Sequence, residues 1–330
     1  MSVNRFKSVG FLVSSVSLAL SLPVAAQSNL SAVMPKKALV IVVPNAAAGP
    51  TDFLARVIQN RLSEALHQSV IVDNRPSANG VTAGEIVAHA NPDGSTIGVG
   101  NTGTHAINAT LYRHLSYDPG KDFAPIVNVF DTALVLAAHP KLKADTIKDI
   151  IALSKKAPGS VNAAIAGATG EIATNAIKML AGIDINNVPY KGGSPAVIAV
   201  ISGEAQFVLT PYGGVGPQAD AGKLRILGVT GGKRDPLLPN VPTLSESGLP
   251  GYEVTMWYGL FAPAKTPTSV VAALNQEISQ IVNSTEIKSK ITSQGYQIVT
   301  GSPEEFALLV RKDLERYRKV ILEAKMQQDL

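Results

Sequence analysis

Short apolar runs alternate with amphipathic segments along most of this chain. The run Leu39–Val43 stops at Pro44, and apolar positions then recur at helical spacing from Phe53 to Leu66. Similar runs predict strands at Leu39–Val43, Val70–Val72, Thr96–Gly100, Leu134–Ala138, Val161–Ile165, Ile185–Val188, Phe207–Leu209, Leu224–Val229 and Trp257–Ala262. Helical spacing predicts helices at Phe53–Leu66, Gly84–Ala90, Ile147–Lys155, Ile172–Leu180, Ala196–Ile201, Pro267–Asn283, Thr285–Ser293 and Pro303–Leu322. This order favours an α/β fold whose mostly parallel sheet has helices on both faces, with enough strands for two lobes.

The N-terminus has the pattern of a secretory signal peptide over residues 1–26. Arg5 and Lys7 precede an apolar run from Val9 to Leu22, and small residues stand before Gln27 at the expected cleavage site. The apolar run is too short for a stable membrane-spanning helix. The sequence therefore predicts an exported protein.

Charge and cysteine content narrow the classes of function. The formal net charge is +4, and removal of Arg5 and Lys7 with the signal peptide leaves +2. This balance argues against a nucleic-acid partner, which requires a concentrated basic surface. The chain has no cysteine, which excludes disulfides, a thiol nucleophile and a thiolate metal site.

Small and polar residues fill the loops that follow several predicted strands. These loops are residues 44–52, 101–104, 166–170, 190–195 and 210–214. Backbone N–H groups at the start of a helix favour anions, and small side chains let an anion approach them. Each loop taken alone is more typical of an ordinary turn than of a binding site. None carries a paired acid and base, so together they favour binding over catalysis.

Other motifs give weaker signals. Gly98, Gly100 and Gly103 match a dinucleotide-binding spacing, but the first two fall inside a predicted strand. The histidines show no close metal-ligand spacing, and no nucleophile-elbow motif is present. The histidines are His67, His89, His105, His114 and His139. We therefore expect no metal site, no cofactor and no catalytic residue.

A set of short motifs in fixed order covers essentially the whole mature chain. They are Ala48-Gly49-Pro50-Thr51-Asp52, Asp73-Asn74-Arg75-Pro76, Asn91-Pro92-Asp93-Gly94, Gly103-Thr104-His105-Ala106-Ile107-Asn108, Tyr117-Asp118-Pro119, Lys121-Asp122-Phe123, Val188-Pro189-Tyr190-Lys191-Gly192, Ala221-Gly222-Lys223-Leu224-Arg225, Asn240-Val241-Pro242-Thr243 and Trp257-Tyr258-Gly259-Leu260. In this order the chain resembles the Bug family, the periplasmic solute receptors of tripartite tricarboxylate transporters.

The resemblance implies a two-lobed periplasmic binding protein of type II-like fold, with a ligand cleft between the lobes and two hinge crossings. The first lobe would comprise residues 38–131 and 228–330, and the second lobe residues 132–227. The hinge strands would lie near Leu134–Ala138 and Tyr258–Ala262. A small organic acid would be held in the cleft, with one carboxylate bound by backbone amides of two loops.

The resemblance also implies the ligand-binding residues. In the first lobe they are Asn45, Ala48, Gly49, Pro50, Thr51, Asp52, Thr102, Gly103, Thr104 and His105. In the second lobe they are Ala168, Thr169, Gly170, Thr210 and Tyr212. Asn45 stands where the family usually has an aromatic residue, and Thr210-Pro211-Tyr212 replaces a segment that usually contains an aspartate. Both departures disfavour a ligand ammonium group, and the Tyr212 ring is available to stack on an aromatic ligand.

The resemblance therefore implies a periplasmic receptor of a Gram-negative cell that passes its ligand to inner-membrane transporter subunits. We expect a dicarboxylate, with an aromatic one such as terephthalate as the favoured candidate, and a monomeric protein that binds no nucleic acid. Two alternatives remain open. One is a ligand-dependent sensor or signalling partner on the same fold, and the other is an exported α/β enzyme.

Overall fold

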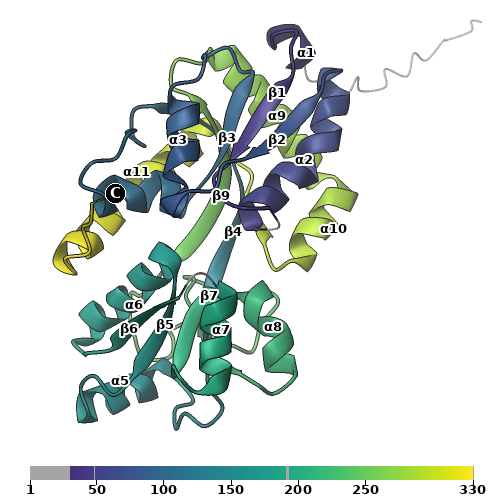
Figure 1. The fold of residues 1–330 in the computed structure, drawn as a ribbon. Coiled ribbons are helices and arrows are strands. Elements are labelled where there is room, and N and C mark those ends of the chain that lie inside the picture. The colour runs from purple at the N-terminus through teal and green to yellow at the C-terminus, as the bar shows by residue number, and fades with distance from the viewer. Residues whose placement is uncertain (1–29, 48, 191–192, 330) are drawn as a thin grey trace, which may run out of the picture.

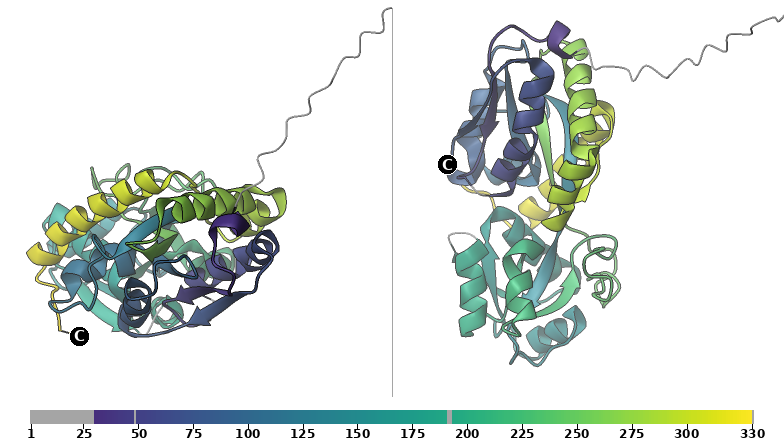
Figure 2. Two further views of the ribbon diagram at one scale, coloured as in Figure 1. Left: turned by 90° about the horizontal axis from the view of Figure 1, so that it is seen from above. Right: turned by 90° about the vertical axis from the view of Figure 1, so that its right-hand side faces the viewer.

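The computed structural model describes residues 30–47, 49–190 and 193–329, which form two lobes (Figure 1 and Figure 2). The helices of the first lobe are α1 (Leu30–Val33), α2 (Pro50–Leu66), the 3-10 turn η1 (Ala78–Gly80), α3 (Val81–Ala88), the π-helical turn η2 (Gly103–Ile107), α4 (Asn108–Leu111), α9 (Thr268–Asn283), α10 (Thr285–Ser293) and α11 (Pro303–Glu323). Those of the second lobe are α5 (Ile147–Lys156), α6 (Gly167–Ala181), α7 (Gly193–Ser202) and α8 (Tyr212–Asp220). None of these helices is long and apolar enough to cross a bilayer.

The described strands form one sheet that continues through both lobes. The strands are β1 (Leu39–Val43), β2 (Val70–Asn74), β3 (Thr96–Asn101), β4 (Phe123–Ala138), β5 (Asn162–Ala166), β6 (Asn186–Tyr190), β7 (Phe207–Pro211), β8 (Arg225–Val229), β9 (Thr255–Pro263) and β10 (Gln297–Ile298). Their order is β2-β1-β3-β9-β4-β7-β5-β6, and both β8 and β10 also pair with β4. Within each lobe the outer strands are parallel, while β4 and β9 run antiparallel to their neighbours.

The long strand β4 makes the first crossing between the lobes. Its residues up to Ala133 pair with β9, and those from Leu134 onward pair with β7 and β8. The chain returns to the first lobe where Val254 leads into β9. The buried Thr230 links both crossings, because its hydroxyl accepts a hydrogen bond from the Leu134 N–H (2.8 Å) and donates one to the Val254 carbonyl (2.6 Å).

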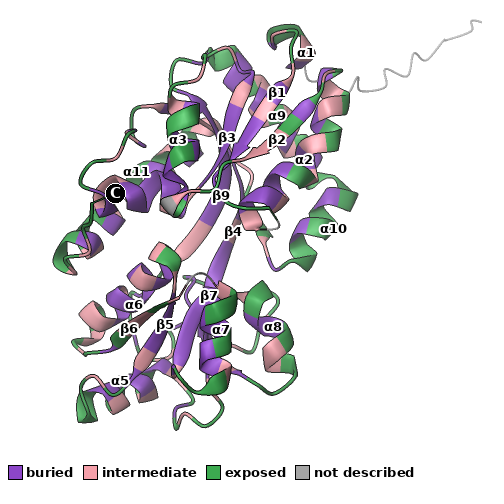
Figure 3. Ribbon diagram, viewed as in Figure 1, coloured by how far each residue is buried: buried purple, intermediate pink, exposed green. Residues whose placement is uncertain are grey.

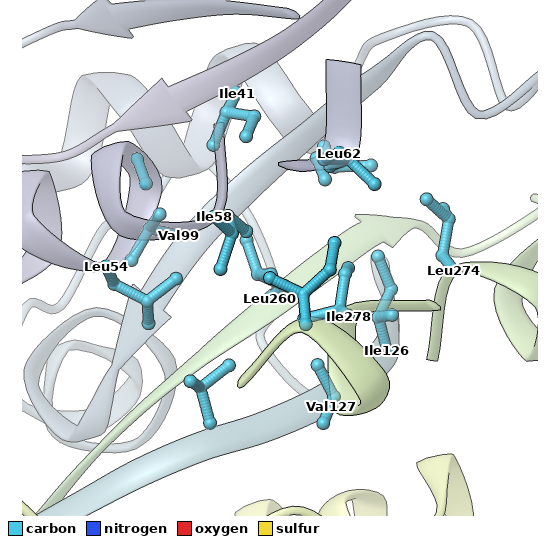
Figure 4. Packing of buried hydrophobic residues seen from close by; sticks show 14 of the residues in the cluster. Ile41, Leu54, Ile58, Leu62, Val99, Ile126, Val127, Leu260, Leu274 and Ile278 are labelled. Carbon is cyan, nitrogen blue, oxygen red and sulfur yellow. The ribbon is translucent and has the colours of Figure 1, made fainter. Parts of the chain in front are cut away.

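Buried apolar residues form clusters on both faces of the sheet in each lobe. Figure 3 shows that the strands are mostly buried and that the exposed residues gather on the helices and loops. In the first lobe, α2 and α9 pack on one face. Figure 4 shows this cluster, in which Leu54, Ile58 and Leu62 of α2 and Leu274 and Ile278 of α9 lie together with apolar side chains of the strands. The other face of this lobe is covered by α3, α4 and α11. The α/β, two-lobed fold class is therefore confirmed.

The lobe boundary after β8 differs from the expected one at 227/228. Leu244, Leu249, Tyr252 and Val254 pack in the apolar core of the second lobe with α5 and α6. Residues 228–254 therefore lie with the second lobe, because their apolar side chains find their buried partners there. The crossings accordingly lie at Ala133/Leu134 and Val254/Thr255. The expected signal peptide, residues 1–26, lies outside the described residues.

Candidate functional site

A cavity of about 160 Å³ lies between the two lobes, where strand ends from both lobes meet. Its lining residues are Asn45, Asn79, Asn101, Gly103, Thr104, Leu134, Ala166, Gly167, Ala168, Thr169, Gly170, Leu209, Thr210, Pro211 and Met256. Seven of the expected site residues are in this set: Asn45, Gly103, Thr104, Ala168, Thr169, Gly170 and Thr210. This volume is below the range of roughly 300–1,000 Å³ that is usual for small-molecule pockets, so the cavity is small.

The wall of the first lobe is a loop held by reciprocal hydrogen bonds. At the end of β3, the Asn101 N–H donates to the Thr104 hydroxyl (3.0 Å), and the Thr104 N–H donates to Asn101 Oδ1 (3.0 Å). The Tyr117 hydroxyl donates to the Thr104 carbonyl (2.7 Å) from the core behind the loop. These bonds fix the backbone of residues 101–104 at the edge of the cavity.

His105 lies behind this loop in the core, and it is not among the residues that line the cavity. Its ring stacks on Phe261, with 3.9 Å between the ring centroids and 13° between the planes. Burial lowers the pKa of His105 to about 3, so the ring is neutral. Its Nδ1 is 2.8 Å from the Thr104 hydroxyl. A proton on Nδ1 satisfies this contact while Thr104 donates to the Asn101 carbonyl (3.2 Å). His105 therefore supports the loop from the core side.

The wall of the second lobe is the first turn of α6 together with the end of β7. Helix α6 begins at Gly167 and has no side-chain cap at its N-terminus, so its first N–H groups are available to a ligand. Gly167 has a φ of +81°, a conformation that favours glycine. A Cβ on Gly170 would lie 3.3 Å from the Leu209 carbonyl oxygen, which shows how closely α6 approaches β7. Thr210 of β7 completes this wall.

Most of the expected first loop faces elsewhere. Asn45 lines the cavity, and its Oδ1 accepts a hydrogen bond from the Thr51 hydroxyl (3.0 Å). Asp52 is buried and forms a salt bridge with Arg56 (2.9 Å). Gly49, Pro50 and Asp52 line a separate groove of about 890 Å³ between α2 and α10. The side chains of Thr51 and Asp52 therefore stabilise the first turn of α2 by contacts within the first lobe. Ala48 lies outside the described residues.

Two further expected site residues have structural contacts instead of a place in the cavity wall. The buried Thr102 hydroxyl accepts a hydrogen bond from the Trp257 N–H (3.0 Å), which ties the loop after β3 to β9. Tyr212 begins α8 and lies against Gly295 of the first lobe, where a Cβ on Gly295 would be 3.7 Å from the Tyr212 ring. Tyr212 therefore joins the lobes outside the cavity, and its ring does not line the space where a ligand ring would stack.

The structure adds Asn79 and Asn101 to the polar lining, and the sequence analysis assigned neither. Asn101 directly follows a predicted strand, so its position at a strand end could have indicated a site residue. Asn79 has a φ of +46° in the short turn before α3, and no local pattern places it beside β3. Met256 reaches the cavity because β9 crosses between the lobes, which is a long-range effect of the topology.

The described cavity wall contains no Arg, Lys, Asp or Glu side chain. Its polar groups are three asparagine amides, three threonine hydroxyls and the exposed backbone of the glycine-containing loops. Such groups bind an anion by hydrogen bonding and lack the acid–base pair that hydrolysis or proton abstraction requires. The geometry is that of a binding site.

Comparison with known proteins agrees with this geometry. Residues 54–326 match the family model of the tripartite tricarboxylate transporter family receptor. The chain is 30% identical to the protein BugT of Bordetella pertussis, over 88% of this chain and 90% of that protein. It is 33% identical to a UPF0065 protein of Pseudomonas sp. (strain P51), over 88% of both chains.

Solved structures give the same result. The R. palustris protein Rpa4515 with adipate is 33% identical, with a TM-score of 0.79 over 88% of this chain and 98% of that one. MatC from Rhodopseudomonas palustris with bound malate is 31% identical, with a TM-score of 0.76 over 87% of this chain and 100% of that one. The periplasmic binding protein BugD is 28% identical, with a TM-score of 0.76 over 89% of this chain and 99% of that one. The chain belongs to the tripartite tricarboxylate transporter receptor family, whose members are periplasmic solute-binding receptors and not enzymes.

Proposed function

We propose that the cavity between the lobes binds a small aliphatic dicarboxylate, with one carboxylate on each lobe. The observation that carries this proposal is the placement of hydrogen-bonding groups without charged side chains at both ends of one described cavity. Each of two anionic groups, at opposite ends of the ligand, would meet uncharged hydrogen-bonding groups of one lobe.

The carboxylate at the second lobe is proposed to bind the first turn of α6. This helix has 15 residues and no side-chain cap, so its free N–H groups and the positive end of its dipole favour an anion. Thr169 is part of the same cavity wall, and its hydroxyl would be a further donor to the ligand. The carboxylate at the first lobe is proposed to bind Asn45 and the loop that follows β3.

The size of the cavity and the solved relatives support an aliphatic ligand. A volume of about 160 Å³ is below the usual range of drug-sized pockets. Relatives at 33% and 31% identity were solved with adipate and malate, which are both aliphatic dicarboxylates. Because Tyr212 is not among the lining residues, the stacking contact expected for terephthalate lacks its partner ring.

The test compares two threonines of the same helix. Thr169→Val removes a hydroxyl from the cavity wall, whereas Thr174→Val removes a buried hydroxyl whose bond goes to the Gly170 carbonyl (2.9 Å). Calorimetric titration with adipate, malate and terephthalate should show wild-type binding of an aliphatic diacid. Thr169→Val should weaken it by about five- to tenfold, roughly 1 kcal/mol. Thr174→Val should change stability more than affinity. Absence of binding by both adipate and malate, whether or not terephthalate binds, would refute the proposed ligand class.

We further propose that the mature protein acts as a monomer in the periplasm of a Gram-negative cell and delivers its ligand to membrane subunits of a tripartite transporter. The signal-peptide pattern of residues 1–26 and the family membership support this role. Cell fractionation should place the mature protein in the periplasmic extract. Uptake of the bound diacid should fall when the receptor is deleted, and unchanged uptake would contradict the transport role.

A further inference from the structure

The side chain of Asn101 has one fixed orientation at the cavity wall. Its Oδ1 accepts the hydrogen bond of the Thr104 backbone N–H (3.0 Å). A backbone N–H can only donate, so this contact identifies the oxygen branch of the amide without ambiguity. The Nδ2 group is on the other branch, turned away from the loop that Oδ1 contacts.

The partners of Asn101 resist a flip of this amide. Thr104 is only 3% exposed, and its hydroxyl contacts both the Asn101 N–H (3.0 Å) and His105 Nδ1 (2.8 Å). A flipped amide would direct two N–H groups at the Thr104 N–H and leave that donor without its acceptor. The loop therefore holds Asn101 in the orientation that presents Nδ2 away from it.

No acceptor for Asn101 Nδ2 is found among the described residues, and the described cavity wall contains no carboxylate. A ligand oxygen is the acceptor that this geometry calls for. We propose that Asn101 is a specificity-determining residue, which selects a carboxylate over an ammonium group at the end of the ligand that meets the first lobe. This inference rests on the proposed binding of a dicarboxylate.

The test reverses the chemistry of one atom. In Asn101→Asp, one carboxylate oxygen still accepts the Thr104 N–H, and the other replaces the donating nitrogen with a negative oxygen. Adipate should bind about 100-fold more weakly, because two carboxylates would meet. 6-Aminohexanoate, which carries an ammonium in place of one carboxylate, should bind more tightly than it binds wild type. A structural defect alone would not reverse this preference.

A second variant and a control guard against a folding defect. Asn101→Ser keeps a hydroxyl oxygen that accepts the Thr104 N–H but lacks the amide donor. It should lose about tenfold in adipate affinity without gaining affinity for 6-aminohexanoate. Asn60→Asp on the exposed surface of α2 introduces the same charge and should bind like wild type. All variants are compared by calorimetry after thermal melts establish that they fold.

Two outcomes separate this inference from the proposed function. If wild type binds adipate and Asn101→Asp keeps the wild-type preference, the role of Asn101 is refuted and dicarboxylate binding stands. If wild type prefers 6-aminohexanoate to adipate, both the proposed ligand class and the role of Asn101 are refuted. Reversal of preference in Asn101→Asp alone supports the assignment.

Discussion

Thr230 and Leu134 are joined by a reciprocal pair of hydrogen bonds at the first crossing between the lobes. The Thr230 N–H donates to the Leu134 carbonyl (2.9 Å), and the Leu134 N–H donates to the Thr230 hydroxyl (2.8 Å). The same threonine exchanges hydrogen bonds with Val254 at the second crossing, through its carbonyl (2.8 Å) and its hydroxyl (2.6 Å). One buried residue therefore couples the two segments about which the lobes would move.

Thr230→Val keeps the shape of this side chain and removes its hydroxyl. The Leu134 N–H and the Val254 carbonyl would lose a buried partner, so we expect a loss of about 2–4 kcal/mol in the free energy of unfolding. Chemical denaturation measures this loss. Thr230→Ser retains the hydroxyl and should lose less than half as much. Equal losses in both variants would assign the effect to packing of the methyl group.

Tyr212→Ala should weaken the contact between the two lobes, because the Tyr212 ring lies against Gly295 of the first lobe. Since Tyr212 is not among the lining residues, affinity should fall by a common factor of about tenfold for every ligand, roughly 1.4 kcal/mol. Titration of adipate and malate measures the two factors. Tyr212→Phe keeps the ring and should bind like wild type. A loss confined to one ligand would indicate direct contact with it.

His105 should make stability depend on pH. Burial lowers its pKa from 6.5 to about 3, so below pH 6.5 the unfolded chain takes up a proton that the folded protein excludes. Its contribution is complete above pH 6.5 and is lost as the pH falls toward 3, by up to about 1.4 kcal/mol per pH unit. In His105→Phe, denaturation at pH 7, 5 and 4 should show a shallower decline. Parallel declines in both proteins would contradict the buried neutral imidazole.

Asp131 of β4 should have the opposite pH dependence. Burial raises its pKa from 3.8 to about 6, the Asp313 carboxylate adds to this rise, and the hydrogen bond from Asn128 opposes it. The fold therefore disfavours the ionised form, and wild type loses stability as the pH rises from about 4 to about 6. Asp131→Asn should be more stable at pH 7 by on the order of 2 kcal/mol. The gain should disappear near pH 4, and a gain independent of pH would exclude this cause.

Local patterns predicted most of the regular elements. The strand Leu39–Val43 and the helix Thr285–Ser293 have the expected bounds, because each apolar pattern ends at a clear break. The strand β4 begins at Phe123, well before the expected Leu134. Its first half contains Pro125, Asn128 and Asp131, which interrupt the apolar pattern. Pairing with β9 and β10 stabilises this half, and local sequence does not encode that partner.

Helix α8 and part of the site could also not be predicted from local sequence alone. Helix α8 contains Gly213, Gly214, Gly216 and Pro217, which all have poor helix propensity, and no helix was expected there. The strand-end loops were identified from their small and polar residues, and several of them line the cavity. Which side chains face the cavity depends on contacts distant in sequence. These contacts hold His105 against Phe261 and Tyr212 against Gly295.

The 16 residues of β4 have a mechanical consequence for the receptor. Strand β4 passes from one lobe to the other without interruption, so the two lobes share one continuous β-sheet. A change in the angle between the lobes would have to bend β4 together with the strands hydrogen-bonded to it. The pairing of β4 is irregular on both sides of the crossing, where a strand bends more easily. The register shifts lie at Pro125/Val127, Asn128/Phe130 and Leu136/Ala137. We therefore expect the bending of β4, which connects the lobes directly, to limit how far the binding site opens to admit a ligand.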